Sequence, residues 1–438
     1  MPIYRESGEK LLYEVVKVQT CSGQPLEVTT ASGNTVYMQP AGVAGDAFGR
    51  LRTSAPLTLF DSSHRYRDND LWATSTGTGG TYAFSSSEGL VNLNVTTASG
   101  AEVVRETTKV SSYQPGKSLQ VMNTFVMASG KANLRQRVGY YGASNGIYLE
   151  VSGVSSPSFV ERSSSSGSLQ ETKVSQADWN IDKLDGTGQS GLTLDITKAQ
   201  ILWMDIEWLG EGTVRVGFVI NGQFIHCHSF HHANLISSTY ITTASLPLRY
   251  EITNVGTTAS SSTLKQVCST VISEGGYELR GVQQAVGTDI NTPRALTASG
   301  TYYPIASLRL KSTALDAVVI PTAISIMASG GNSNYSWRIA ASTTTSGGTW
   351  TSAGNNSSVE YNLSGTSSSG GRVVAQGYFS AANQSTNSVD ILKEALFKFQ
   401  LERNGLTSTP YEFSVLVATN SSTGSAVFGA VDWEEISR

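Results

Sequence analysis

The residues best suited to chemistry are concentrated in one short stretch of the chain. Residues 226–232, HCHSFHH, hold four of the five histidines and one of the three cysteines. Imidazole and thiolate groups are the usual ligands of zinc and related metals, and a histidine near a cysteine can activate a nucleophile. The stretch is therefore a metal site, a catalytic centre, or a strand with unusual side chains.

A hairpin is the element that must position these side chains. Asn221-Gly222 is a strong signal for a two-residue hairpin loop between two β-strands. We therefore expect residues 214–220 to pair with residues 223–230, with Ile220 opposite Gln223.

Alternation along this hairpin decides which way each side chain points. With an unbroken period of two, Cys227 joins the apolar face, whereas His226 and His228 share the opposite face. Arg215 then lies opposite His228, and a fixed guanidinium would repel a metal cation. We therefore interpret His226 and His228 as packing or subunit-contact residues. The alternative is a metal site, completed by three chains that meet on a symmetry axis.

Other candidate sites are weaker. Asp178, Asn180 and Asp182 place oxygen atoms at the first, third and fifth positions of a calcium-type loop, but the glycine expected at the sixth position is missing. Calcium stays an alternative here. The chain has no Gly-x-Ser-x-Gly motif, and Glu207 beside Trp208 is the one acid that we would test for catalysis. We expect no enzyme activity and no cofactor.

Composition excludes several classes of function. Charged residues make up 15% of the chain, against about 25% in average globular domains. The net charge of −4 and the lack of basic runs argue against a nucleic-acid-binding protein. We expect no membrane insertion either, because no stretch approaches 18 apolar residues. Three scattered cysteines do not form a disulfide framework.

Short β-rich runs separated by Gly, Ser, Asn and Asp dominate the chain, a pattern typical of sandwiches and barrels. Recurrent turn sequences end in glycine, as TASG at 97–100 and 297–300 and MASG at 127–130 and 327–330. We expect each of these glycines to adopt a positive φ. The one convincing helical pattern is at residues 390–399.

These patterns predict an all-β fold. We expect two antiparallel, jelly-roll-like β-sandwich domains, at residues 56–285 and 286–438, preceded by an N-terminal arm at residues 1–55. The arm holds two strand candidates, Leu11–Val18 and Thr35–Met38, which are too few to bury a core of their own.

Several segments carry a resemblance to a known family. The chain resembles a family of virion structural proteins of tailed bacteriophages, common in marine and cyanobacterial phages. The resemblance spans residues 46 to 280 and continues more weakly to the end. Its segments are DAFGRLRTSAPLTLFDSSHRY, SYQPGKSLQVMNTF, RVGYYGASNGIYLE, QADWNIDKLDGTGQSGLTLD, DIEWLGEGTVRVGFVINGQFIHCHSF, LPLRYEI and CSTVISEGGYE. Residues 207–225 also have the pattern of a concanavalin-like or laminin-G-like sandwich.

The resemblance implies a non-enzymatic structural component of the virion, assembled in the host cytoplasm. We expect it in the tail, baseplate or fibre apparatus, with a head decoration protein as the alternative. Its expected partners are other virion proteins, and we expect a homotrimer, because virion proteins usually act around a symmetry axis.

A second hypothesis is recognition of a host-surface glycan. Sugar rings stack on exposed aromatic side chains, and the candidates are Trp72, Tyr140 and Tyr141 in the first domain. A polysaccharide depolymerase is a further alternative, for which the sequence provides no recognisable site.

Overall fold

The computed structural model gives a chain built almost wholly of antiparallel strands. It describes residues 26–29, 35–38, 55–278, 280–329, 333–381, 399–421 and 424–437. Residues 56–438 form one compact unit, and residues 1–55 form another. Within the first unit, β1 (Leu26–Thr29) pairs with β2 (Thr35–Met38), so the strand expected at Thr35–Met38 is confirmed.

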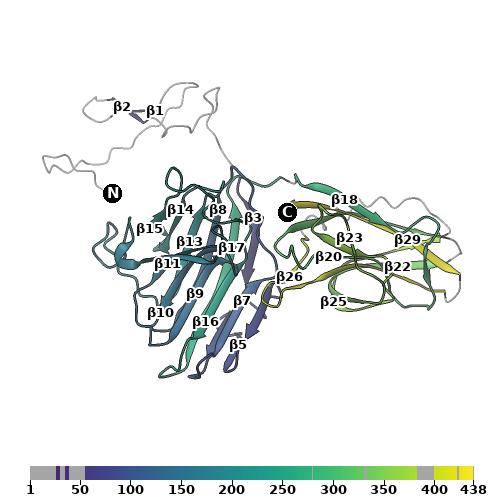
Figure 1. Ribbon diagram of the computed structural model, residues 1–438, viewed down its shortest axis with the longest axis horizontal. Helices are drawn as coiled ribbons and strands as arrows, with labels where there is room; N and C mark the ends of the chain where they lie inside the picture. The colour runs from purple at the N-terminus through teal and green to yellow at the C-terminus, as the bar shows by residue number, and fades with distance from the viewer. Residues whose placement is uncertain are drawn as a thin grey trace. The chain divides into compact units, whose positions relative to one another are not determined.

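A seven-stranded and an eight-stranded sheet form what we call the first sandwich (Figure 1). The seven-stranded sheet has the order β12 (Gln170–Ser175), β11 (Ser158–Ser163), β10 (Gly146–Ser152), β9 (Leu134–Tyr141), β16 (Leu248–Asn254), β7 (Glu102–Thr107) and β4 (Trp72–Thr76). The eight-stranded sheet has the order β15 (Gln223–Phe230), β14 (Val214–Ile220), β13 (Gln200–Ile206), β8 (Leu119–Val126), β17 (Ser262–Ser273), β6 (Leu90–Val95) and β5 (Gly80–Ser85), and β3 (Leu57–Ser63) pairs with β17.

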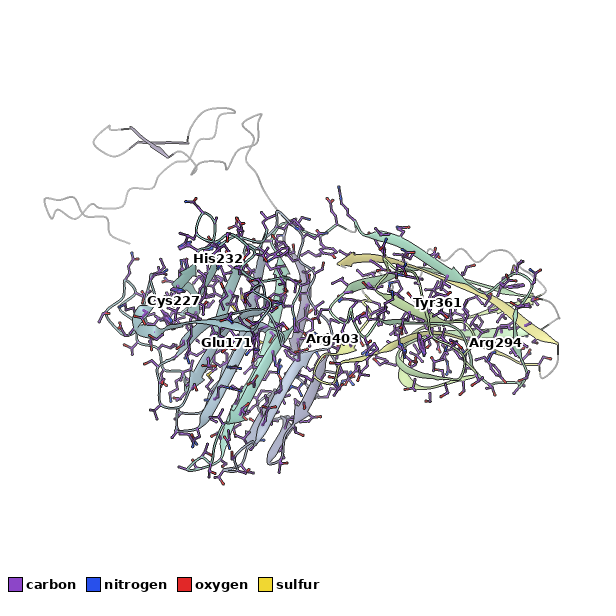
Figure 2. All side chains as sticks on the ribbon, in the orientation of Figure 1. Glu171, Cys227, His232, Arg294, Tyr361 and Arg403 are labelled. Carbon is purple, nitrogen blue, oxygen red and sulfur yellow. The ribbon has the colours of Figure 1, made fainter. Side chains whose placement is uncertain are left out.

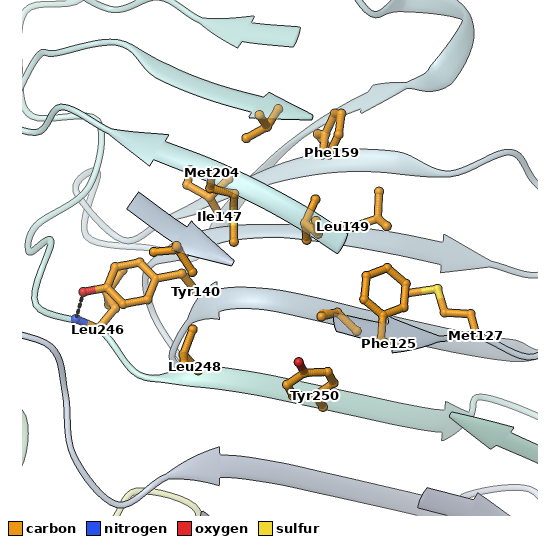
Figure 3. Close-up of a cluster of buried hydrophobic side chains, with 14 of the residues drawn as sticks. Phe125, Met127, Tyr140, Ile147, Leu149, Phe159, Met204, Leu246, Leu248 and Tyr250 are labelled. Carbon is orange, nitrogen blue, oxygen red and sulfur yellow. Dashed lines mark hydrogen bonds between the residues drawn. The ribbon is translucent and has the colours of Figure 1, made fainter. Parts of the chain in front are cut away.

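The core of the first sandwich follows from the alternation of side chains along its strands. In β8 every second residue from Leu119 to Phe125 is buried, and these residues pack against Tyr140, Leu248 and Tyr250 of the other sheet. Figure 3 shows this apolar layer, in which the Tyr140 hydroxyl accepts a hydrogen bond from the Leu246 backbone at 3.0 Å. The buried hydroxyl keeps a polar partner, as the low dielectric of a core requires.

A four-stranded and a six-stranded sheet form what we call the second sandwich. The four-stranded sheet joins β18 (Val282–Gly287), β29 (Ser425–Ser437) and β19 (Arg294–Leu296), and β21 (Val318–Ala328) also pairs with β29. The six-stranded sheet has the order β23 (Thr351–Ser352), β24 (Val359–Asn362), β20 (Tyr303–Leu310), β28 (Glu412–Thr419), β22 (Asn334–Ser346) and β25 (Ser367–Ser380). A short hairpin pairs β26 (Arg403–Asn404) with β27 (Thr409–Pro410).

The predicted fold class is confirmed, since antiparallel sheets form sandwich-like domains in this chain. β18 begins at Val282 and already pairs with β29, so the strands change sheet before residue 285. The division at residues 55 and 285 stays a prediction. The strand expected at Leu11–Val18 lies outside the described residues, as does the helix expected at 390–399 except for its last residue.

The positive φ expected at the last glycine is confirmed in the TASG sequences at 97–100 and 297–300. Gly100 and Gly300 have φ angles of 78° and 73°. Gly130, in the MASG sequence at 127–130, does not have a positive φ, so the expectation is wrong at this position. Gly33 and Gly330 lie outside the described residues. Among the described residues, no helix is long and apolar enough to span a membrane.

The first prediction concerns the core of the first sandwich. Trp179 is 2% exposed and stacks on Phe159 with ring centroids 4.5 Å apart. We expect Trp179→Ala to lower the free energy of unfolding by about 4 kcal/mol, because it removes a large buried side chain and leaves a cavity. Ile181→Ala, at a side chain that is 49% exposed, is the matched control. Equal losses in urea unfolding of the two variants would contradict this account of the core.

Candidate functional site

The hairpin that holds the histidine stretch forms as the sequence predicts at its turn. β14 pairs with β15, and Ile220 lies opposite Gln223. Cys227 is buried, as expected, and burial raises the pKa of its thiol far above the usual range. A protonated, buried thiol is a poor nucleophile and a poor metal ligand.

A β-bulge separates the two central histidines. His226 lies opposite Gly217, but His228 lies opposite Val216, so Cys227 is an extra residue in β15. Because residues opposite each other share a face, His228 follows Val216 toward the core and His226 stays on the outer face. The expectation that both histidines share the outer face is therefore wrong.

The same bulge moves Arg215 away from His228. Arg215 lies opposite Ser229, not His228, and its guanidinium is paired with Asp205 on β13. The expected position of Arg215 is thus wrong, since a strict period of two cannot anticipate an extra residue.

Each of the two histidines has its own hydrogen bonds. The backbone amide of Asn180 donates to Nδ1 of His228 at 3.3 Å, and Phe230 packs edge-on against the His228 ring. Nε2 of His226 lies 2.9 Å from Oγ of Ser229 and 3.1 Å from the carbonyl oxygen of His228. Within the part of the chain that the structure describes, no group of three or more His, Cys, Asp or Glu side chains could hold a metal ion.

Among the histidines of residues 226–232, His232 has the shortest polar contacts, and no pattern in the sequence predicts them. Nε2 of His232 lies 2.7 Å from Glu161, Nδ1 lies 2.6 Å from the carbonyl oxygen of Gly212, and the ring stacks on Tyr240. Burial alone would lower the pKa of His232, but Glu161 and the Gly212 carbonyl outweigh it and raise the pKa. Both ring nitrogens have partners, and the pair with Glu161 connects the segment after β15 to strand β11.

The calcium-type loop uses its oxygen atoms locally. Asp182 accepts backbone hydrogen bonds from Leu184 and Ser190, and the Asn180 side chain bonds the backbone of Ser229. Asp178 accepts a hydrogen bond from Ser175. These groups cap turns instead of converging on one point.

Glu207 likewise has a local role. Its Oε2 accepts a hydrogen bond from the Thr213 backbone at 3.2 Å, across the loop between β13 and β14.

The three aromatic residues predicted to contact a glycan are all buried. Trp72 lies in the core and donates to Ser62 at 2.8 Å, and Tyr140 lies between the sheets. Tyr141 is on the outer face but is covered by charged side chains. The expectation that these rings are exposed is therefore wrong, and the glycan contact that rested on it has no support at these positions.

The outer face of the seven-stranded sheet carries the densest polar arrangement of the first sandwich. Its members alternate with the core residues along five adjacent strands, which places them on one surface. We call this surface the ionic face and define it by Arg135, Arg137, Tyr141, Tyr148, Glu150, Arg162, Glu171, Lys173, Arg249 and Glu251.

Ion pairs connect the ionic face from strand to strand. Glu150 lies 2.7 Å from Arg137 and 2.5 Å from Lys173. Glu171 lies 2.7 Å from Arg162 and accepts a hydrogen bond from the Tyr148 hydroxyl at 2.8 Å (Figure 2 labels Glu171). Each of these acids therefore links two or more strands.

Two tyrosines of the ionic face are in contact, with their rings tilted by 37°. The rings of Tyr141 and Tyr148 have centroids 4.4 Å apart, and the Arg162 guanidinium lies 5.4 Å and 5.1 Å from them. Arg249 covers Tyr141 from the other side at 5.4 Å. Gly139 makes room for this layer, because a Cβ there would lie 2.6 Å from that of Tyr148. The cations thus both stack on rings and pair with acids.

Two acids of this face, Glu150 and Glu171, have pKa values below the usual value of a glutamate, which favours their ionised form. Burial alone would raise the pKa of both carboxyl groups. The pKa of Glu150 is lowered by the hydrogen bond from Lys173 and the charge of Arg137. The pKa of Glu171 is lowered by the hydrogen bonds from Tyr148 and Arg162 and by the charge of Arg137. A glycosidase needs one carboxylic acid that stays protonated to donate to the leaving group. The lowered pKa values of Glu150 and Glu171 are the opposite of what such a proton donor needs.

No protein-family model matches the chain, and no curated protein matches it. Solved structures that are similar to it have low identity and low TM-scores. A β-glucanase of Bacillus licheniformis is 12% identical, with a TM-score of 0.31 over 48% of this chain and 96% of its own. A carbohydrate esterase of the Shiga toxin-encoding bacteriophage phi24B is 12% identical, with a TM-score of 0.31 over 50% of this chain and 100% of its own. The CBM2 module of the evolved Dit of Lactobacillus casei BL23 phage J-1 is 7% identical, with a TM-score of 0.32 over 52% of this chain and 100% of its own.

The second prediction concerns His228 and pH. Burial, and then the nearby His226 and His231, lower the pKa of His228 from 6.5 to about 4. Between these values the unfolded chain binds a proton at this histidine and the folded chain does not, so stability falls as the pH falls. We expect His228→Gln to lessen that loss in urea unfolding between pH 6.5 and about 4. Gln223→Ala, at an exposed position of the same hairpin without a titratable group, is the control. An unchanged pH dependence in His228→Gln would contradict the burial of a neutral imidazole.

Proposed function

We propose that this chain is a non-enzymatic structural component of a tailed phage virion, assembled in the host cytoplasm as part of the tail, baseplate or fibre. The sequence resemblance supports the virion assignment. The observation that favours contact over catalysis is the ionic face, where Glu150 and Glu171 are ionised and tied to cations on neighbouring strands. A fixed pattern of opposite charges gives a surface that selects complementary partners.

The outer face of the hairpin provides a contact patch for assembly. Phe224 is 52% exposed, and its ring lies 5.6 Å from that of Trp203, which in turn lies 5.9 Å from the His226 ring. Gly217 leaves room for the indole, since a Cβ there would lie 3.0 Å from Nε1 of Trp203. Aromatic side chains of this kind are common anchors of protein interfaces. We assign this patch to contacts between copies of the chain in a homotrimer.

The third prediction is the location of the protein in the particle. We expect immunogold labelling with antibodies against residues 56–438 to mark the tail end of purified virions. Labelling confined to the capsid shell would overturn the tail assignment and favour a head decoration protein. An absence of label, with the protein also missing from purified particles by mass spectrometry, would overturn the virion assignment itself.

The fourth prediction tests the contact patch. We expect Phe224→Ser to weaken trimer formation about tenfold or more in analytical ultracentrifugation, because burying a Phe side chain contributes roughly 1.5–3 kcal/mol. The fold should be unaffected, since half of the side chain is already exposed. Val154→Ser, at a side chain that is 82% exposed in a different turn, is the matched control. A wild-type chain that stays monomeric, or a variant that assembles normally, contradicts the assignment.

The competing enzyme hypothesis has a direct test. A depolymerase would shorten purified host polysaccharide, and Glu150→Gln or Glu171→Gln would abolish that activity if the ionic face were catalytic. We expect no shortening by the wild-type chain.

A further inference from the structure

The second sandwich carries a polar cleft that the proposed function does not use. Its volume is about 710 Å³, and its walls include Arg309, Thr344, Arg372, Glu402 and Tyr411. Thr344 and Arg372 are exposed, whereas Glu402 is buried in the wall. The size is within the range of sites that enclose small ligands.

Glu402 is the least satisfied group of this cleft. Its side chain is 5% exposed, and Oε2 accepts a hydrogen bond from the Ser342 hydroxyl at 3.1 Å. Oε1 is buried and accepts no hydrogen bond from the described residues. Its nearest cations, Lys109 and Arg372, are 3.5 Å and 3.8 Å away, too far for good hydrogen bonds. A buried carboxylate oxygen without a donor is costly, so a ligand that supplies one gains binding energy.

The backbone that holds Glu402 in place is itself unusual. Ser342 is an extra residue in β22, where the register shifts between Ala341 and Thr343, and its φ is 56°. A positive φ is unfavourable for a serine, and it persists here inside a β-bulge. Bulges of this kind re-aim side chains beside functional sites. Ser342 uses its hydroxyl to fix one oxygen of Glu402, which leaves the other oxygen for a ligand.

The balance of charge selects the class of ligand. Arg309 and Arg372 face the cleft together with Asp70, Glu402 and Glu412. An anionic ligand would meet the carboxylates, and a cationic ligand would meet the guanidinium groups. A neutral polyhydroxylated ligand suits both, because each hydroxyl donates one hydrogen bond and accepts others.

One aromatic residue of the cleft, Tyr411, and one outside its lining, Trp350, add to this preference. The Tyr411 ring lines the wall, and the guanidinium of Arg309 is held 4.1 Å above the ring of Trp350. The stacking fixes the plane of Arg309, whose Nε also donates to Glu360 at 3.0 Å. Aromatic faces pack against the C–H faces of sugar rings, while a fixed guanidinium donates to their hydroxyls.

We infer that this cleft binds a neutral oligosaccharide, with Glu402 and Arg372 as the recognising pair. Arg372 lies 3.8 Å from Oε1 of Glu402, and its side chain is 47% exposed, against 19% for that of Lys109. A sugar hydroxyl that donates to Glu402 and accepts from Arg372 satisfies both groups at once. The inference does not depend on where in the particle the chain resides.

The fifth prediction is a binding measurement with the full chain. The probes are maltohexaose, cellohexaose, laminarihexaose and mannohexaose, with the hexamers of galacturonic acid and of glucosamine as charged counterparts. We expect at least one neutral hexasaccharide to bind in calorimetry and saturation-transfer NMR, in preference to both charged hexamers. Glu402→Gln and Arg372→Ala should each weaken that binding about tenfold or more, because hydrogen bonds to charged groups are lost.

Two further variants make the result specific to the cleft. Thr344→Trp, at an exposed position on the wall, should block binding while the unfolding curve stays like that of the wild type. Arg280→Ala removes a cation outside the cleft, at a side chain that is 80% exposed, and this variant should bind normally. The inference is overturned if no neutral hexasaccharide binds at millimolar concentration, if the charged hexamers bind better, or if the cleft variants retain full affinity. The result of virion labelling does not depend on oligosaccharide binding, so a failure of the proposed function can be distinguished from a failure of this inference.

Discussion

The structure depends on the pairing of charges that its sheets bury. Only 15% of the residues are charged, yet several of these lie in the interior. Arg105 is fully buried and donates to the two oxygens of Asp68 at 2.5 Å and 2.9 Å and to Gln266 at 2.7 Å. Arg403, also buried, donates to Glu106 at 2.6 Å (Figure 2). Removing an ion from water costs several kcal/mol, so each such cation fixes the position of the acid on another segment.

The ionic face applies the same constraint on the outer side of the seven-stranded sheet, where Arg137, Glu150 and Glu251 are themselves buried. Buried ion pairs contribute little net stability compared with apolar packing, but they define one arrangement of side chains, because any other leaves a charge unpaired. Arg137 is shared between Glu150, Glu171 and Glu251 at 2.7 Å, 3.7 Å and 3.6 Å, so three acids from three strands are set by one guanidinium. Side chains fixed in this way keep little conformational freedom, because each charge is held by more than one partner.

The sequence predicts local features well and distant ones poorly. The strands, the hairpin at Asn221-Gly222 and the buried Cys227 follow from patterns within a few residues. The ionic face does not, because its contacts join residues far apart, such as Arg135 and Glu251 at a separation of 116 residues. The burial of Tyr140 and Tyr141 was missed for the same reason. A tyrosine on a strand faces the core or the outside according to a register that only the folded sheet determines.

Two of the β-bulges in these sheets lie at side chains with unusual environments. In β15 the extra residue Cys227 sends His228 inward while His226 stays outside. In β22 the extra residue Ser342 places Ala341 opposite Phe413, on the core face, and Thr343 opposite Glu412, on the other face. An unbroken strand would give both members of each pair the same face. In a chain built mainly of strands, one extra residue in a strand reverses the face on which the following side chains lie, with little change to the rest of the sheet. Positions where the period of two breaks are therefore the first places to search for binding residues.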